Sequence, residues 1–259
     1  MIYRCIFVVF TLIAILGCTS QTKNIPDKNF VVFETLKKHP EVVMDILREN
    51  KVVLWEIVDQ GFKVKRKKER IKRLKAELDN PRKPEIKAGR NFLGNLNAPI
   101  TIVGYSDFHC YYCAKASETI ETLIEKYPEK IRFYFKHLPS KDLSLELAMY
   151  FEAIAEQDSK KAWDFHFLVF GDQKALKNDK NMALKKILDL LEVDQNQLQK
   201  DLDSKDISDL IAQDKQEAEK FGFNGTPSFL VNGIALLGAA PLEEFEKMIK
   251  IIEDNNKNK

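Results

Sequence analysis

The chain has 259 residues, of which 44% are hydrophobic and 31% are charged. This apolar fraction is that of an ordinary globular protein, and the length is enough for one or two domains. The 41 basic and 39 acidic residues leave a formal net charge of +2, so no overall field attracts nucleic acid or a membrane surface. We therefore expect no nucleic-acid partner.

The first residues have the features of an export signal. Arg4 supplies a short basic region, and residues 6–16 form an apolar run that is too short for a transmembrane helix. Residues 15–18, with the sequence ILGC, resemble a bacterial lipobox, where a lipoprotein precursor is cut. We expect a lipid on Cys18 that anchors the chain in the cell envelope, facing the periplasm or the exterior. A retained N-terminal anchor is the alternative, and it leads to the same compartment.

The cysteine count then becomes informative. Of the four cysteines, Cys5 would leave with the signal peptide of residues 1–17, and Cys18 would carry the lipid. Cys110 and Cys113 are left alone in the exported part of the chain. Because stray thiols are a liability in an oxidising compartment, one closely spaced pair there indicates a working redox couple.

After a polar tether over residues 18–28, the sequence predicts a small helical domain. Apolar residues recur at helical spacing over residues 29–61, and Pro40 is placed to open a second helix. A unit this short cannot bury its broad apolar face by itself. We interpret residues 29–78 as an arm that joins copies of the chain into a homo-oligomer. Docking of the arm on its own second domain is the alternative.

A strongly basic stretch follows at residues 63–75, where the helical stripe of apolar residues continues. It has no interleaved aromatic residues for base stacking, so we interpret it as a solvated helix that links two domains. Binding to an anionic membrane surface is the alternative. Pro81 and Pro84 end the helix, so the arm and its linker helix are expected to cover residues 29–88.

The second domain, residues 89–255, begins with strands around a helix. Residues 91–93 are predicted as a short edge strand, and residues 100–105 form an apolar run that is typical of a buried strand. A helix follows to about residue 127. Residues 131–137 alternate apolar and polar side chains, as a half-buried strand does. This strand–helix–strand order predicts a parallel pair with a right-handed crossover.

Cys110 and Cys113 stand where the buried strand ends and the helix begins. Free backbone N–H groups and the helix dipole stabilise an anion at such a place, which lowers the pKa of a thiol there. Cys110, the outer residue, is therefore the candidate nucleophile. Cys113 lies one turn further in and is the candidate resolving thiol.

Two other uses of a Cys-x-x-Cys pair stay open. The pair is half of a zinc site, and His109 or His137 could add ligands, although their spacing matches no common zinc pattern. The pair could also be a closed structural disulfide. A structural zinc site usually needs a second cysteine pair, which the exported part of the chain lacks. A two-residue gap at a helix start also suits exchange better than a structural disulfide, so we expect no metal and no cofactor.

A long helical stretch follows the second strand. From residue 143 to residue 221, apolar residues recur at helical spacing without a strand signal. A block of this length between strands is too long for a loop and indicates a helical subdomain inserted at about residues 141–221. His166 lies among its apolar residues, and we interpret it as a packed, satisfied core histidine rather than a catalytic base.

The sheet is expected to resume near the end of the chain. Residues 228–231 and 234–237 are predicted to pair through the Asn-Gly turn at residues 232–233. Pro241 opens a last helix. The polar tail, residues 254–259, is expected to fray.

Three features jointly carry a resemblance: the cysteine pair, residues 225–227 (GTP) before the hairpin, and residues 163–166 (WDFH). They resemble the DsbA-like branch of the thioredoxin superfamily. The resemblance implies an α/β thioredoxin-like fold with an inserted helical subdomain, here preceded by a small all-α domain. It also implies a cis bond before Pro227, with Thr226 and Pro227 beside Cys110. Spacing alone predicts only a turn there.

The chain departs from this family at informative positions. Tyr112 stands where oxidases similar to DsbA have a thiolate-stabilising histidine, and Tyr112 and Thr226 are both similar to the isomerases of the superfamily. His109 is expected to tune the pKa of the first cysteine in part. Gly104 replaces the buried acid that thioredoxins carry six residues before that cysteine. Proton transfer at the second cysteine therefore has no evident base.

These features predict an extracytoplasmic thiol:disulfide interchange protein that forms or rearranges disulfides in exported, cysteine-containing proteins, leaning to isomerase. The substrate-contacting residues are expected to be Tyr111, Tyr112, Phe108, Thr226 and Pro227. A membrane protein is the expected redox partner. Two alternatives remain: a monomeric-type dithiol oxidase with the same pair, and a non-catalytic envelope lipoprotein scaffold.

Overall fold

The computed structural model describes residues 28–257. The expected signal peptide (residues 1–17), the lipidated Cys18 and nearly all of the tether lie outside these described residues. The chain divides into two compact units, Met1–Lys65 and Arg66–Lys259. Among the described helices, none combines the length and the hydrophobicity that spanning a membrane requires.

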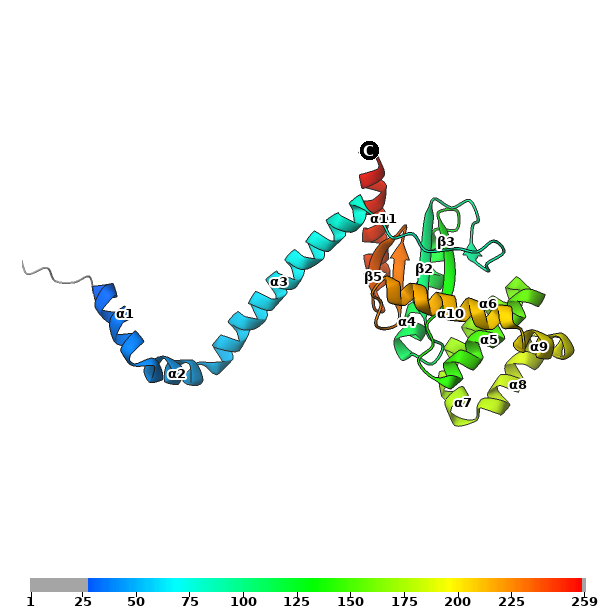
Figure 1. Ribbon diagram of the computed structural model, residues 1–259, viewed down its shortest axis with the longest axis horizontal. Helices are drawn as coiled ribbons and strands as arrows, with labels where there is room; N and C mark the ends of the chain where they lie inside the picture. Colours follow the sequence, from blue (N-terminus) through cyan, green and yellow to red (C-terminus); the bar gives the residue numbers. More distant parts are fainter. Residues whose placement is uncertain (1–27, 258–259) are drawn as a thin grey trace, which may run out of the picture. The chain divides into compact units, whose positions relative to one another are not determined.

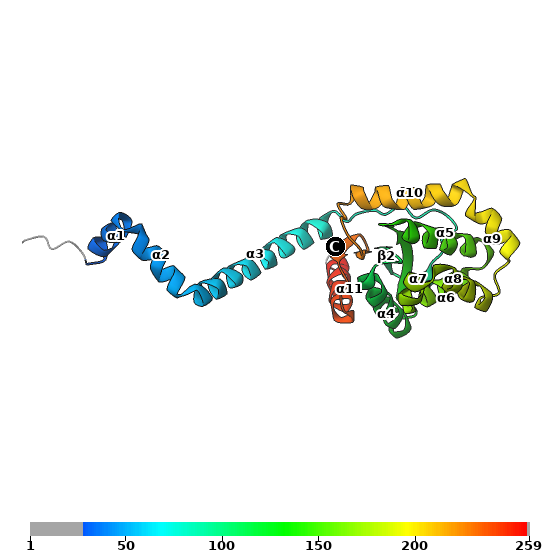
Figure 2. The same cartoon turned by 90° about the horizontal axis from the view of Figure 1, so that it is seen from below.

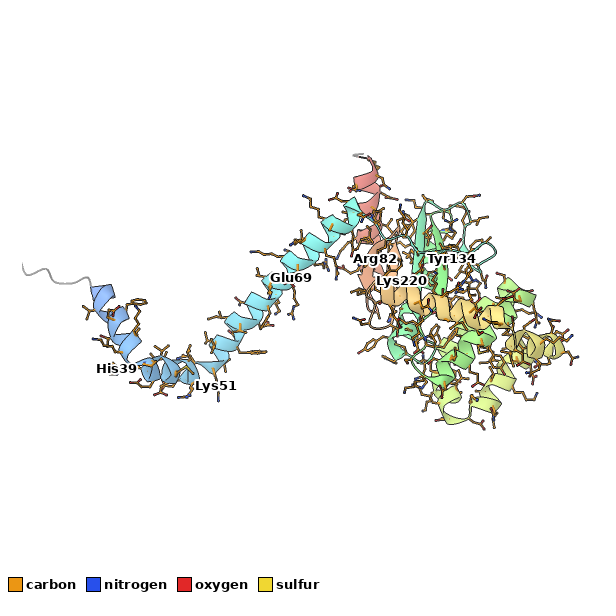
Figure 3. The ribbon with its side chains drawn as sticks, viewed as in Figure 1. His39, Lys51, Glu69, Arg82, Tyr134 and Lys220 are labelled. Atoms are coloured by element: carbon orange, nitrogen blue, oxygen red, sulfur yellow. The ribbon has the colours of Figure 1, made fainter. Side chains whose placement is uncertain are left out.

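The first unit is helical, as its sequence pattern predicts. It contains α1 (Lys28–Lys38), α2 (Pro40–Glu49) and the first part of α3 (Lys51–Asp79) (Figure 1). Pro40 stands at the start of α2, where its fixed φ suits a helix and its missing N–H costs no hydrogen bond. The joints between the helices lie at His39 and just before Lys51, both labelled in Figure 3.

The apolar side chains that the structure describes between residues 31 and 65 are exposed or partly exposed. Residues 31–65 contain no buried side chain, although many of them are large and apolar. Those that are more than half exposed are Val32, Phe33, Ile46, Val52, Val53, Trp55, Ile57, Phe62 and Val64. We call this set the arm's apolar surface.

The second unit is built on one mixed five-stranded sheet. Its strands are β1 (Leu93–Gly94), β2 (Ile100–Ser106), β3 (Ile131–His137), β4 (Ser228–Val231) and β5 (Ile234–Leu237). They lie in the order β1-β3-β2-β4-β5, with β2 and β3 parallel and the other neighbours antiparallel. Asn232 and Gly233 form the predicted turn between β4 and β5, and both have positive φ, at 45° and 85°. The strand β2 therefore lies in the middle of the sheet.

Helices cover both faces of this sheet (Figure 2). The helices α4 (Tyr111–Lys126) and α11 (Leu242–Lys257) pack on one face, and α10 (Lys205–Lys220) packs on the other. The predicted helical insertion lies between β3 and β4 and ends with α10. Its other helices are α5 (Asp142–Gln157), α6 (Ser159–Gly171), α7 (Gln173–Asn178), α8 (Lys180–Leu190) and α9 (Gln195–Leu202).

The alternating pattern of β3 predicts a half-buried strand, but this prediction is wrong. All of its residues are buried except Arg132, which is partly exposed. The face that carries Tyr134 and Lys136 is covered by α10, and Lys136 Nζ lies 2.5 Å from Glu217 Oε2 of that helix. This face of β3 therefore packs against α10, which supplies Glu217 as a carboxylate partner for Lys136. The alternation of apolar and polar residues does not indicate a face that is exposed to water.

The second unit also begins earlier than expected. Glu77, near the end of α3, is buried, and its carboxylate accepts hydrogen bonds from Ala235 N at 2.8 Å and Arg82 Nη1 at 2.6 Å. Arg82 N in turn donates to the carbonyl oxygen of Gly233 at 3.0 Å. These bonds attach the end of α3 to the hairpin of β4 and β5. Residues 66–88, expected to belong to the arm and linker, are therefore part of the second unit.

The last helix is longer than expected. The sequence predicts a frayed tail from residue 254, whereas α11 continues to Lys257. Ile252 is buried, and Lys130 Nζ lies 3.7 Å from Glu253 Oε1. Packing and this ion pair keep the last turns of α11 on the domain.

Candidate active site

The cysteine pair lies at the carboxyl end of the central strand. The strand β2 ends at Ser106, a short turn follows, and Cys110 is the N-cap residue of α4. The carbonyl oxygen of Cys110 accepts hydrogen bonds from the backbone N–H groups of Cys113 and Ala114, at 3.1 and 3.3 Å. The pair therefore occupies the first turn of a helix, where an anion is stabilised.

Cys110 is the partly exposed member of the pair. Its Sγ lies 3.6 Å from the carbonyl oxygen of Thr226. Hydrogen bonds from the Cys113 thiol, the Thr226 side chain and backbone N–H groups of the first turn outweigh burial and lower the pKa of Cys110 to about 5. Cys110 is therefore a thiolate at neutral pH, which is the form that attacks disulfides.

Cys113 has the opposite environment. It is buried, with 1% of its surface exposed, and both this burial and its hydrogen bond to Cys110 raise its pKa far above that of a free thiol. Both cysteines are free thiols in this structure. The inner thiol therefore keeps its proton and donates it in a hydrogen bond to the outer thiolate. An ionised outer sulfur beside a protonated inner one suits thiol–disulfide exchange.

The loop before β4 closes the site on its other side. The peptide bond between Thr226 and Pro227 is cis, as the resemblance implies. The carbonyl oxygen of Pro227 accepts a hydrogen bond from Gly238 N at 2.9 Å, which holds the loop to the end of β5. Thr226 is partly exposed and Pro227 is buried. The residue that meets Cys110 is therefore Thr226, while Pro227 shapes the loop.

The aromatic residues beside the pair differ in their exposure. Tyr111 and Tyr112 are 61% and 63% exposed, and their ring centroids are 5.5 Å apart. Phe108 is 2% exposed, and its ring packs against Phe135 and Phe170 at centroid distances of 5.1 and 5.0 Å. The expectation that Phe108 contacts substrate is therefore not met, because the side chain supports the turn from inside the core.

The two histidines considered as partners of the pair lie in different surroundings. His109 is partly exposed, and its backbone N–H donates to Asp107 Oδ1 at 2.6 Å. The leading contributions to the pKa of Cys110 come from other groups, so the tuning role of His109 stays a prediction. His137 is buried, and its Nε2 lies 2.7 Å from Glu152 Oε1. That bond pairs one ring nitrogen of His137 with a carboxylate.

Two further residues hold the site in place. The buried carboxylate of Asp107 accepts hydrogen bonds from the backbone N–H and the hydroxyl of Ser140, at 2.9 and 2.6 Å. Gln173, the first residue of α7, donates from Nε2 to the carbonyl oxygens of Phe108 and Cys110, at 2.8 and 3.0 Å. An aspartate directly after a strand is a turn signal that sequence reasoning could have used. Gln173 lies in the insertion, and no pattern around it indicates this contact.

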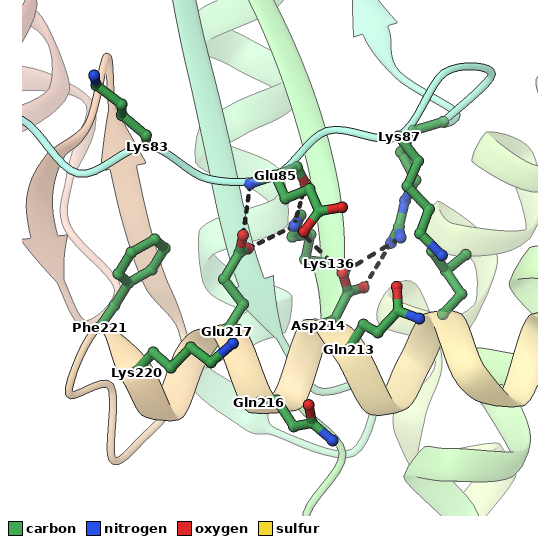
Figure 4. A pocket seen from close by; sticks show the side chains of 12 residues that line it. Lys83, Glu85, Lys87, Lys136, Gln213, Asp214, Gln216, Glu217, Lys220 and Phe221 are labelled. Carbon is green, nitrogen blue, oxygen red and sulfur yellow. Dashed lines mark hydrogen bonds and ion pairs between the residues drawn. The ribbon is translucent and has the colours of Figure 1, made fainter.

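A charged hollow lies elsewhere in the second unit (Figure 4). It is lined by residues from the segment before β1, from β3 and from α10, and neither Cys110 nor Cys113 lines it. Inside it, Arg90 Nη2 lies 2.7 Å from Asp214 Oδ2, and the ion pair between β3 and α10 lies beside them. Because these buried charges are paired with one another, we assign the hollow a structural role.

Comparison with known proteins decides the family. Residues 87–251 match the protein family described as Thioredoxin. The chain belongs to the thioredoxin family. A curated relative, the probable disulfide bond formation protein D of Bacillus cereus, is 34% identical to it over 150 residues, which cover 54% of this chain and 69% of the relative.

Other curated relatives of this thioredoxin-family chain share only a part of their length. The Na(+)/H(+) antiporter NhaA 3 of Salinispora tropica is 31% identical over 141 residues, which are 54% of this chain but 21% of the antiporter. The chain thus spans about a fifth of the length of that relative. The likeness to this antiporter therefore concerns only that part of its length.

Solved structures agree with the thioredoxin-like fold. The crystal structure of α-DsbA1 from Wolbachia pipientis matches with a TM-score of 0.58 and 23% identity, covering 67% of this chain and 96% of that one. Proteus mirabilis ScsC in a transitional conformation matches with a TM-score of 0.56 and 21% identity, covering 85% of this chain and 97% of that one. At these identities the likeness concerns the fold.

Proposed function

We propose that this protein is a thiol:disulfide oxidoreductase that forms or rearranges disulfide bonds in exported proteins, with Cys110 as nucleophile and Cys113 as resolving thiol. The observation that carries the proposal is the split between the two thiols at the start of α4. Cys110 is partly exposed and its pKa is lowered, whereas Cys113 is buried and its pKa is raised. The name of the Bacillus cereus relative, disulfide bond formation protein D, supports this function.

As an isomerase, the protein starts from the dithiol form. The Cys110 thiolate attacks one sulfur of a wrong substrate disulfide, a Cys110–substrate disulfide forms, and the other substrate sulfur leaves as a thiolate that takes a proton from water. A second substrate thiolate then displaces Cys110 and forms the rearranged disulfide. Alternatively, Cys113 attacks the sulfur of Cys110, which releases the substrate reduced and leaves the enzyme pair oxidised.

As an oxidase, the protein starts from the Cys110–Cys113 disulfide. A substrate thiolate attacks Cys110, and Cys113 leaves with the electron pair and is protonated. A second substrate thiolate then displaces Cys110, so the substrate gains a disulfide while the enzyme is reduced. The low pKa of Cys110 makes it a good leaving group in this last step. A membrane redox partner would reset the pair after each turnover.

The substrate surface that we propose consists of Tyr111, Tyr112 and the loop at Thr226. The two tyrosines are exposed and lie directly after the nucleophile, and Thr226 is partly exposed beside it. Together they offer aromatic rings and an open stretch of backbone to an extended peptide. Pro227 contributes indirectly, because it is buried under the loop.

The isomerase preference rests on Tyr112 and Thr226, which are similar to the isomerases of the superfamily, and on the N-terminal arm, which we propose joins copies of the chain. The arm's apolar surface is exposed in the described residues 31–65, and surfaces of this kind mark interaction sites. Helices with an uncovered apolar face bury it by packing on other helices. Linked active sites would let one copy hold a substrate while another acts on it.

We also propose that the chain is a lipoprotein of the cell envelope, anchored through Cys18 and facing the periplasm or the exterior. Support comes from the lipobox-like sequence at residues 15–18 and from the single cysteine pair in the rest of the chain. Labelling with a radioactive fatty acid tests the anchor. Incorporation into the native chain and not into a Cys18→Ala variant is expected.

Reactivation of scrambled ribonuclease tests the main proposal. We would compare the chain from residue 19 with a chain from residue 66, since residues 66–88 pack with the second unit. The longer chain is expected to reactivate the ribonuclease, and the shorter one only to oxidise thiols. If both chains only oxidise, the protein is an oxidase and the arm has another use. If the Cys110→Ser variant performs as well as the native chain, the redox proposal fails and the scaffold alternative stands.

A further inference from the structure

A small internal cavity lies directly behind the resolving thiol. It is lined by Cys113, Ser106, Ser117 and His166 together with apolar and aromatic residues. Each of these polar residues is at least nine-tenths buried. The space is just large enough for about one water molecule, and its lining is mostly apolar. His166 Nδ1 is the buried polar side-chain atom among these lining residues that has no partner in the described part of the chain.

His166 is the unusual member of this lining. Its Nδ1 is buried and has no hydrogen-bond partner among the described residues. Its ring packs against Phe135 and Phe170, which also line the cavity, at centroid distances of 4.7 and 4.8 Å. An unpaired buried nitrogen costs about 1–3 kcal/mol, so a residue used for packing alone would be better apolar. The histidine is therefore packed but not satisfied, which corrects the expectation from sequence.

The state of this histidine limits what it can do. Burial, and to a lesser extent the nearby His137, lower the pKa of His166 to about 3. The imidazole is therefore neutral at physiological pH and cannot act as a general acid, because it carries no imidazolium proton to transfer. A neutral imidazole can still donate one hydrogen bond, from Nδ1 in the appropriate tautomer.

The resolving thiol needs such donors because the usual acid cannot be placed here. A Cβ atom on Gly104 would lie 2.8 Å from the ring of Phe133 and 2.9 Å from the ring of Phe229. The two rings occupy the space that an acidic side chain at position 104, as in thioredoxins, would need. The Ser106 side chain already forms a hydrogen bond with Cys113 that acts against the burial of the thiolate. One neutral donor is thus in place beside the sulfur.

We propose that the hydroxyl of Ser106, directly, and the neutral imidazole of His166, through a water shared with Ser117, donate hydrogen bonds to the Cys113 thiolate. This inference rests on the proposed function. In the resolving step, Cys113 loses its proton to solvent and attacks the sulfur of Cys110. The Cys110–Cys113 bond forms, and the bond from Cys110 to the substrate breaks with its electron pair leaving on the substrate sulfur. In the reverse step, the same donors stabilise Cys113 as it leaves.

The experiment separates the two cysteines by mixing the reduced protein with one equivalent of 5,5′-dithiobis(2-nitrobenzoate). Cys110 attacks first and releases one thionitrobenzoate, and Cys113 then displaces the second from the mixed disulfide. Stopped-flow absorbance follows both phases. The variants are Ser106→Ala, His166→Leu and His166→Asn, because the amide nitrogen of asparagine can replace Nδ1. Ser144→Ala is the matched control, since Ser144 is a buried serine with an unpaired hydroxyl that does not line the cavity.

We expect Ser106→Ala and His166→Leu to slow the second phase roughly 10- to 100-fold, as the loss of a hydrogen bond to a charged sulfur implies. The first phase should change little, His166→Asn should restore much of the second phase, and Ser144→Ala should change neither. Unchanged second phases, or equal slowing of both phases, would overturn the inference, as would failure of His166→Asn to restore the rate in a folded variant. If the native chain releases only one equivalent, the proposed function itself fails.

Discussion

At the scale of single residues, two identical side chains acquire opposite properties. Cys110 receives hydrogen bonds from its partner thiol, from Thr226 and from the first turn of α4, whereas Cys113 is enclosed in the core. The three positions that separate them along the chain correspond to about one helical turn. That turn is enough to place one sulfur at the surface and the other inside.

The acidity of Cys110 gives the first prediction. The rate of alkylation by iodoacetamide should follow the thiolate fraction, with a midpoint near the pKa of about 5 and a plateau above it. Cys113→Ala should raise the midpoint by about one to two pH units, because it removes the leading hydrogen bond to the thiolate. Cys113→Ser keeps a donor and should raise it less. A midpoint near that of an ordinary cysteine in the native chain would contradict the site described above.

At the scale of elements, the helical insertion supports the catalytic turn. Gln173, at the start of α7, donates to two carbonyl oxygens of the turn that carries Cys110. The helix α6, which precedes it, carries His166 to the cavity behind Cys113. The insertion therefore supplies positioning groups from two of its helices, in addition to covering the core.

Replacing Gln173 by alanine tests this support. The variant should lower the free energy of unfolding by about 1 kcal/mol, the usual net contribution of a hydrogen bond, and should also slow thiol exchange at Cys110. Gln157→Ala is the matched control, because Gln157 Nε2 donates to the carbonyl oxygen of Asp194 at 3.3 Å, away from the cysteines. Equal rates of exchange in the two variants, measured by the stopped-flow assay, would show that Gln173 has no role in positioning.

The arm makes its own prediction at this scale. Trp55 is 67% exposed on α3, so a second copy that buries it should not tolerate a charge there. Trp55→Glu is expected to shift the chain toward monomer, measured by size-exclusion chromatography with light scattering. Gln60→Glu adds the same charge at a polar, exposed position of the same helix and should leave the oligomer intact. A native chain that is monomeric at all concentrations would refute self-association through the arm.

At the scale of the whole second unit, a buried charge network joins distant segments. Arg90 Nη2 lies 3.1 Å from Glu152 Oε1 and 2.7 Å from Asp214 Oδ2, and His137 pairs with the same glutamate. The network connects the segment before β1 with α5, α10 and β3. Burial alone would raise the pKa of Glu152, but Arg90 and His137 outweigh it and hold this pKa below its ordinary value. The ionised form of Glu152 is therefore favoured by folding.

This network predicts how stability depends on pH. Because the pKa of Glu152 is lower in the folded state, its contribution is fully present above the unfolded value of about 4.3 and is lost as pH falls through the folded one. Glu152→Gln should destabilise the chain by about 3 kcal/mol at neutral pH and weaken this acid dependence. Urea unfolding from pH 7 down to acid tests it, with the exposed Glu156→Gln as control. Identical acid dependence in the two variants would exclude the network as its source.

Much of this protein was predictable from local patterns. The strand at residues 131–137, the hairpin at residues 228–237 and the inserted helices follow from periodicity and turn chemistry, which depend on neighbours in the chain. The location of Cys110 and Cys113 between a strand and a helix follows from the apolar pattern, which changes there from a strand-like run to helical spacing. Signals of this kind act between residues that are close in sequence, so they do not depend on tertiary contacts.

What only the tertiary structure decided concerns groups brought together from far apart. The sequence predicts that Phe108 contacts substrate beside the cysteines, but its ring is enclosed by rings from β3 and α6. Gln173 carries no sequence signal for its contact with the turn of the cysteine pair, because Cys110 lies 63 residues away in the chain. His166 belongs to the segment that carries the family resemblance, but only the folded chain places it beside the cavity at Cys113. The exclusion of an acid at Gly104 likewise depends on two rings from other strands. Sequence by itself determined where the reactive sulfurs stand, whereas packing decided which groups surround them.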